Sequence, residues 1–229
     1  MRFIWFLVFW SVIPFSAQAG EEDLYDFLWL DPDKSVYVLQ NKIYPKDNSY
    51  YLDLGYLINM SSTFQDTNGA QIKGGYYFSE EWALELSHMK YSNTDNGTLD
   101  SVKVVAGLAP FVRRPLSSTT LYLIWSPFYG KINTFNQIYY FDWSFGVGTG
   151  TYQMESNLDT VELKTEDRFE TESYTPVQIK TSLKFHLNRN MHLGIEFINT
   201  NIRTNSPKNP NSKSWDQNND LIFNIGVSF

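Results

Sequence analysis

The sequence predicts an all-β fold, an eight-stranded antiparallel transmembrane β-barrel, from three observations. Apolar and polar residues alternate with a period of two along most of the chain, which is typical of strands with one apolar face. The connections between these segments are alternately long and short, as they are in a barrel with loops at one rim and turns at the other. The chain finishes on "DLIFNIGVSF", in which Phe223, Ile225, Val227 and Phe229 share one face.

Composition and charge exclude several other classes of protein. The 229 residues fit one domain, and 17% aromatic residues against 19% charged residues is not a disordered composition. The absence of cysteine excludes a small disulfide-stapled module. The net charge of −7 comes with no basic stretch, so we expect no nucleic-acid surface.

The first twenty residues, "MRFIWFLVFWSVIPFSAQAG", have the pattern of a secretory signal. One positive charge, Arg2, precedes a bulky apolar run, and an A-x-A site predicts cleavage between Ala19 and Gly20. Pro14 interrupts the run, which is shorter than the roughly 20 residues that a membrane helix needs. We therefore predict a signal peptide at 1–19, a periplasmic N-terminal segment at 20–48 and the barrel at 49–229.

Four predicted strands occupy the first half of the barrel. "YYLDLGYLIN" and "GAQIKGGYYF" alternate cleanly between an apolar and a polar face. "EWALELSHMKY" begins in the same way and loses its phase near His88, where we expect it to leave the membrane. "TTLYLIWSPFYG" is mostly apolar, and Pro127 is expected to end it because proline cannot donate to a strand ladder.

Four more predicted strands complete the ring: "QIYYFDWSFGVG", "VQIKTSLKFHL", "MHLGIEFIN" and the terminal segment. The expected long loops are 60–68, 93–118, 149–174 and 203–218, and the expected tight turns lie around Ser79–Glu81, Lys131–Phe135 and Asn188–Asn190. Aromatic residues beside the turns predict a lower girdle at the membrane boundary. They are Tyr76, Phe78, Trp82, Phe128, Tyr129, Tyr139 and Phe141.

Two structural alternatives stay open at this point. A soluble β-sandwich also has alternating strands, but its large aromatic residues would pack inward. A ten-stranded barrel would need two further strands, at Val102–Ala109 and near Thr160–Lys164.

Three segments also carry motifs of a known family. They contain Gln40, Lys42 and Tyr44, then Gly75, Tyr76, Phe78, Glu80 and Trp82, then Trp125, Pro127, Tyr129, Gly130, Lys131 and Phe135. With these motifs, residues 36–153 and the terminal strand resemble an outer-membrane β-barrel domain family found in myxobacteria and related predatory bacteria. The resemblance implies residence in the outer membrane and no particular activity. Proteins of this class also resemble one another in ending on an aromatic residue that the barrel-assembly machinery reads, as Phe229 would be.

The polar faces predict a charged lumen. Its charges are Asp53, Lys73, Glu85, Asp142, Lys180, Lys184 and Glu196. Because an eight-stranded barrel is only wide enough for side chains to fill it, we expect these groups to pair and to close the lumen. A narrow channel is the alternative.

Catalytic and metal-binding signals are weak. His88 and Ser92 faintly resemble the His-x-Ser-Asn element of lipid A deacylases, but their spacing is longer and no acidic partner follows. His186 and His192 flank one turn without a third metal ligand. We therefore predict no catalytic residue, no cofactor and no metal site.

The resulting functional prediction is a monomeric barrel of the cell outer membrane with a structural or surface-interaction role. Its expected partners are outer-membrane lipid, lipopolysaccharide and the barrel-assembly machinery. A barrel enzyme acting on lipid A or phospholipid, a narrow channel and a soluble periplasmic binding module are the alternatives.

Overall fold

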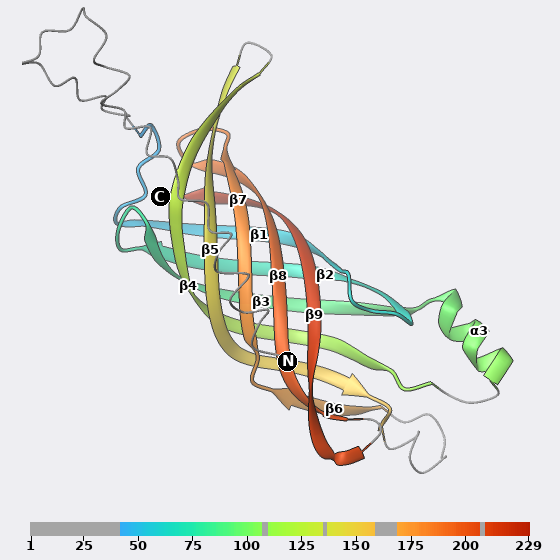
Figure 1. Cartoon of the computed structure of the whole chain (residues 1–229). Helices are drawn as coiled ribbons and strands as arrows, with labels where there is room; N and C mark the ends of the chain where they lie inside the picture. The colour runs from blue at the N-terminus through green and yellow to red at the C-terminus, as the bar shows by residue number, and fades with distance from the viewer. Residues whose placement is uncertain (1–41, 107–109, 135–136, 159–168, 207–208) are drawn as a thin grey trace, which may run out of the picture. The chain divides into compact units, whose positions relative to one another are not determined.

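The structure, a computed structural model, describes residues 42–106, 110–134, 137–158, 169–206 and 209–229. Within them, eight antiparallel strands form a closed ring in chain order, because β9 returns to pair with β1 and β4 pairs with β5 (Figure 1). The ring consists of β1 (Ser49–Asn59), β2 (Gln65–Tyr77), β3 (Trp82–Asp95), β4 (Arg113–Thr134), β5 (Gln137–Ser156), β7 (Val177–His186), β8 (Met191–Ser206) and β9 (Asn209–Ser228). The predicted eight-stranded antiparallel barrel is confirmed.

A ninth, short strand continues one wall of the barrel instead of adding another. Strand β6 (Glu170–Tyr174) pairs with the outer end of β5 up to Tyr152↔Tyr174, and β7 takes over the same edge at Thr149↔Val177. Pro176 separates them, since it has no N–H to donate to the ladder, and its carbonyl accepts a hydrogen bond from Thr149 Oγ1 at 2.8 Å.

The outer wall of the barrel is apolar and the inner wall is polar. Leu54, Leu86 and Val147 point outward and are 58%, 55% and 59% exposed, whereas their chain neighbours Asp53 and Glu85 point inward and are buried. A closed ring leaves no unpaired strand edge, so such a wall can face lipid. The soluble β-sandwich, which would pack these apolar faces together, is therefore wrong, and the chain is an outer-membrane β-barrel.

Aromatic side chains ring the end of the barrel that has the short turns, which we call the periplasmic end. Trp82 and Trp125 stack at 6.2 Å between ring centroids, and Phe128 lies 5.7 Å from Trp143. The prediction that Tyr129 belongs to this girdle is wrong. It stacks on Tyr140 at 5.9 Å, and its hydroxyl oxygen accepts a hydrogen bond from the backbone of the segment before β1.

Strand β4 does not end at Pro127, as we had predicted. The register shifts between Trp125 and Phe128, which is a β-bulge that accommodates the proline, and the strand continues to Thr134. The β4–β5 hairpin consequently projects beyond the neighbouring strands at the periplasmic end (Figure 1).

Many residues of the predicted long loops belong to strands instead. Strand β3 continues past His88 to Asp95 without losing its inward and outward alternation. Its polarity inverts there, because His88 and Lys90 face outward while Met89 and Tyr91 are buried inside. The apolar belt ends at this level, and the barrel wall continues beyond it into the extracellular space.

The ten-stranded alternative is wrong for the part of the chain that the structure describes. Residues from Val102 to Ala106 belong to helix α3 (Gly97–Ala106), which follows β3, and residues 107–109 and Thr160–Lys164 lie outside the described residues. Among the described residues, no helix has the length and hydrophobicity to span a membrane. The predicted cleavage site at Ala19 and Gly20 also lies outside them.

Candidate functional site

The middle of the lumen contains an ion-pair cluster, which we call the central cluster. It consists of Asp53, Lys73, Glu85, Lys180 and Glu196, which come from β1, β2, β3, β7 and β8 and are at most 3% exposed. Lys73 Nζ pairs with Glu196 and lies 3.0 Å from Asp53 Oδ2 and 3.7 Å from Glu85 Oε2. Lys180 Nζ lies 2.5 Å from Glu85 Oε1 and 3.6 Å from Glu196 Oε1. Two ammonium groups thus hold three carboxylates across the lumen.

Tyr51 and His192 add further contacts to the carboxylates of this cluster. Tyr51 donates its hydroxyl to Glu85 Oε2 at 2.7 Å, and His192 Nε2 lies 2.7 Å from Asp53 Oδ1. Gly226 makes room for that second contact, because a Cβ there would lie 1.9 Å from Asp53 Oδ1 and 2.5 Å from His192 Nε2. A side chain larger than hydrogen at this position would separate the pair.

The two other predicted lumen charges lie nearer the periplasmic end. Asp142 Oδ1 accepts a hydrogen bond from Lys46 Nζ at 2.8 Å, and Asp142 Oδ2 lies 2.7 Å from His186 Nε2. The ammonium group of Lys184 lies 4.0 Å from the centroid of the Tyr51 ring. The structure therefore buries all seven predicted lumen charges and brings five of them into one cluster.

Sequence reasoning missed Lys46. It precedes β1 and lies within the predicted periplasmic segment, yet its side chain enters the barrel, donates to Ser126 Oγ at 2.6 Å and is 4% exposed. Charge balance was the available signal, because the predicted lumen had three cations against four anions and Lys46 makes the two numbers equal.

The segment 42–48 closes over the periplasmic end as a strap. Glu80, in the turn between β2 and β3, receives hydrogen bonds from Lys42 Nζ at 2.6 Å and from the backbone N–H groups of Lys46 and Asp47 at 3.1 Å each. Partial burial raises the pKa of Glu80, but these hydrogen bonds outweigh it and lower the pKa below its ordinary value. Tyr44 stacks on His186 at 4.8 Å and completes the strap.

We expect Glu80→Ala to release the strap. In hydrogen exchange followed by mass spectrometry, the amides of Lys46 and Asp47 should exchange faster in this variant at neutral pH, because their acceptor is gone. Glu81→Ala, at the exposed neighbouring position, is the matched control and should leave both amides protected. Since the folded-state pKa of Glu80 is lowered, its contribution is present above the unfolded pKa and is lost as the pH falls through the folded one. Protection that persists in Glu80→Ala would show that Glu80 does not hold the strap.

The extracellular half of the lumen is filled mainly by apolar and tyrosine side chains. Leu57, Met89, Tyr91, Tyr152, Met154, Ile198, Ile202 and Ile222 form one buried cluster. Tyr91 donates its hydroxyl to Asp220 Oδ2 at 2.8 Å, and Asn59 donates to Asp220 Oδ1 at 2.7 Å. This cluster was also missed, because apolar residues on an inward face contradict the alternation from which the strands were predicted.

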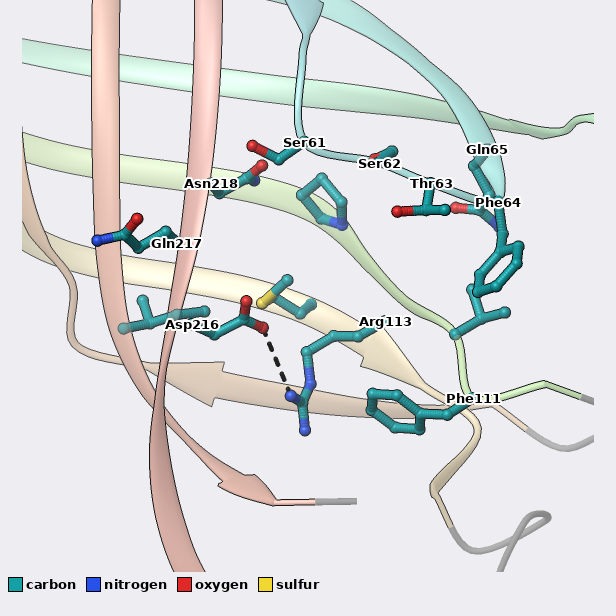
Figure 2. A pocket seen from close by; sticks show the side chains of 14 residues that line it. Ser61, Ser62, Thr63, Phe64, Gln65, Phe111, Arg113, Asp216, Gln217 and Asn218 are labelled. Carbon is teal, nitrogen blue, oxygen red and sulfur yellow. Dashed lines mark ion pairs between the residues drawn. The ribbon is translucent and has the colours of Figure 1, made fainter. Parts of the chain in front are cut away.

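A small pocket of about 200 Å³ lies at the extracellular mouth, between the β1–β2 connection, the start of β4 and β9 (Figure 2). Arg113 lies at its edge, 3.3 Å from Glu172 Oε2 and 3.6 Å from Asp216 Oδ2. Its guanidinium lies 5.0 Å from the Phe111 ring centroid. These contacts tie β4, β6 and β9 together where the lumen opens.

The residues considered for catalysis and metal binding are held by other contacts. His88 faces outward, and its Nδ1 lies 2.8 Å from Thr119 Oγ1. Ser92 is four residues further along β3, or roughly 13 Å at the usual rise per residue, too far for proton transfer to His88. His186 and His192 contact different carboxylates, those of Asp142 and Asp53. Within the described ranges, no group of three or more His, Cys, Asp or Glu side chains could hold a metal ion.

The residues of the predicted assembly signal lie on the outer wall of β9. Phe223, Ile225 and Val227 are 46%, 49% and 42% exposed, and Phe229 is 72% exposed beside Tyr50. Strand β9 also closes the ring against β1, where Val227 pairs with Leu52.

No family model matches the chain, and no curated protein sequence matches it. Among solved structures, the N-terminal β-barrel domain of Pseudomonas aeruginosa OprF is 13% identical, with 80% of this chain and 98% of that chain covered and a TM-score of 0.46. Neisserial surface protein A is 10% identical, with 79% and 95% covered and a TM-score of 0.46. Ail, the attachment invasion locus protein of Yersinia pestis, is 12% identical, with 80% and 99% covered and a TM-score of 0.41.

Proposed function

We propose that this outer-membrane barrel is a non-conducting anchor that carries an extracellular interaction surface. The central cluster is the observation that supports it most strongly. Its five charged groups come from five strands, are nearly inaccessible to solvent, and satisfy one another across the lumen. Ions or polar solutes could pass only if these pairs separated, which would leave buried charges without partners.

The lumen is obstructed above and below this cluster as well. The apolar cluster around Tyr91 and Tyr152 fills the extracellular half, and Lys46 occupies the periplasmic end. Side chains of the described residues therefore occupy the lumen at three successive levels.

The strand extensions beyond the belt form the proposed interaction surface. On the outer wall of β8 and β9, the residues above the apolar belt are polar, and their amide side chains form hydrogen bonds with one another. Asn199 Nδ2 donates to Asn219 Oδ1 at 2.7 Å, and Gln217 Nε2 donates to Asn201 Oδ1 at 3.1 Å. A rigid polar wall of this kind suits contact with water, lipopolysaccharide sugars or another surface molecule.

The expected partners follow from this arrangement. We infer that lipid and lipopolysaccharide contact the belt and its upper edge, that the barrel-assembly machinery recognises β9, and that the chain acts as a monomer. No catalytic step is assigned to it.

Conductance in a planar lipid bilayer tests the closed lumen. We expect the inserted mature protein to give no unitary current steps, because the lumen holds side chains and no water-filled path. A sixteen-stranded porin in the same bilayer is the positive control, and faster gel migration of the unheated protein verifies that the inserted sample is folded. Stable unitary steps from folded protein would contradict the proposal.

A further inference from the structure

A second pocket, which we call the periplasmic pocket, lies under the central cluster and has a volume of about 560 Å³. The strap, β7, the β7–β8 turn and the end of β9 surround it. Its basic side chains are Lys46, Lys184, His186 and Arg189, and its one side-chain carboxylate is that of Asp47.

Lys184 is the most informative of these residues. It is 9% exposed, and among the described residues its ammonium group makes no ion pair or hydrogen bond, only contacts with the faces of two tyrosine rings. The Tyr51 ring centroid lies 4.0 Å away and that of Tyr77 5.7 Å away. A buried cation is costly without a counter-charge, and aromatic faces offset only part of that cost.

Among the described residues, no carboxylate comes close enough to Lys184 to form an ion pair with it. Asp142 is engaged by Lys46 and His186, and Asp47 is exposed at the rim, where it accepts a hydrogen bond from Asn48 Nδ2 at 2.9 Å. The buried groups at this end are therefore two ammonium ions against one carboxylate. The central cluster has two cations and three anions, and the attraction of its Asp53 for Lys184 compensates the charge of Lys184 without forming an ion pair, so the hydrogen-bond donors of the Lys184 ammonium group stay available to a ligand in the pocket.

Lys46 lies beside the same pocket, and its pKa is lowered. Burial lowers its pKa to about 8, and the neighbouring ammonium groups of Lys42 and Lys184 also lower it, although Asp142 raises it. An anion bound in the pocket would raise the pKa of Lys46 again.

We propose that the periplasmic pocket binds a phosphate group, with Lys184 as its buried contact and Arg189 as its contact at the rim. Lysine offers a point charge and arginine a planar fork, and both suit phosphate oxygens. The pocket opens beside Phe229 at the aromatic girdle, so the phosphate could belong to a phospholipid headgroup of the inner leaflet or to a free periplasmic molecule. The two sources share this chemistry and differ in the rest of the molecule.

Titration of inorganic phosphate into the mature protein in octyl glucoside, followed by calorimetry, tests the site. Wild type should bind, and Lys184→Met should bind about tenfold more weakly or worse, because a charge-assisted contact is lost. Lys213→Met makes the same change at an exposed lysine of the extracellular hairpin and should leave the affinity unchanged. Arg189→Ala, at an exposed turn position, should also weaken binding.

Nanodiscs distinguish the two sources. Retention of phosphatidylglycerol over phosphatidylcholine by wild type, and its loss in Lys184→Met, would assign the phosphate to a lipid. Binding of inorganic phosphate without retained phosphatidylglycerol would assign it to a free molecule. If folded wild type binds neither, or if Lys184→Met and Arg189→Ala bind as wild type does, the proposal is wrong. The pocket lies below the closed part of the lumen, so this result and the conductance result are independent.

Discussion

Lys73→Met is expected to destabilise the folded barrel by about 3–5 kcal/mol, the cost of removing one partner from a buried ion-pair network. The substitution keeps an apolar stem but removes the ammonium group, so Asp53 loses its lysine partner and Glu85 and Glu196 pair with Lys180 alone. The free energy of unfolding is measured by urea titration in lipid vesicles, with the heat-dependent shift in gel migration as a second reading.

Two further variants make this result specific. Lys213→Met, on the exposed extracellular hairpin, should change stability by less than about 0.5 kcal/mol. Adding Glu196→Gln to Lys73→Met should restore about 1–2 kcal/mol, because it removes one of the unpaired carboxylates. If Lys73→Met leaves the free energy of unfolding unchanged, water reaches the cluster, and the proposal of a closed lumen is wrong.

Leu54→Arg is expected to cost about 2–4 kcal/mol in the same measurement, because it places a cation on the lipid-facing wall near the middle of the belt. Leu54 is 58% exposed and lies between Ile72 and Ile225 on the neighbouring strands. In a water-soluble protein, an arginine at so exposed a position would hardly change the free energy of unfolding.

The control for Leu54→Arg is the same change on α3. Val104 is 84% exposed on that helix, outside the belt, and Val104→Arg should be neutral within about 0.5 kcal/mol. If both arginine variants are equally stable, the outer wall does not face lipid.

The alternation of apolar and polar residues was enough to predict the barrel, because lipid outside and a narrow lumen inside impose opposite demands on successive residues. The inward positions of Asp53, Lys73 and Glu85 follow directly from that rule. Where the residues depart from this alternation, the extent of the strand was not predicted. Met89 and Tyr91 are apolar residues on the inner face, and His88 is polar on the outer face, so β3 appeared to end while its backbone continued.

Other features depend on contacts that no local pattern encodes. Lys46 lies outside every strand, and only the folded barrel brings it to Asp142, 96 positions along the chain. Pro127 was expected to end β4, but a bulge absorbs it because the partner strand β5 continues past that level. Which carboxylate each lumen lysine meets depends on the stagger between strands around the ring, and that is set by closure.

The arrangement of charges in the lumen also bears on how the barrel is built. Lys73 on β2 pairs with Glu196 on β8, and Lys180 on β7 pairs with Glu85 on β3, so these pairs join strands that are not neighbours in the sheet. An open sheet, whatever its length, would expose these groups without their counter-ions, and its insertion into lipid would require them to stay hydrated. Neutralisation of the interior therefore coincides with the meeting of β1 and β9. A partly assembled chain cannot form these ion pairs until β1 pairs with β9. Closure of the barrel is therefore a single cooperative step.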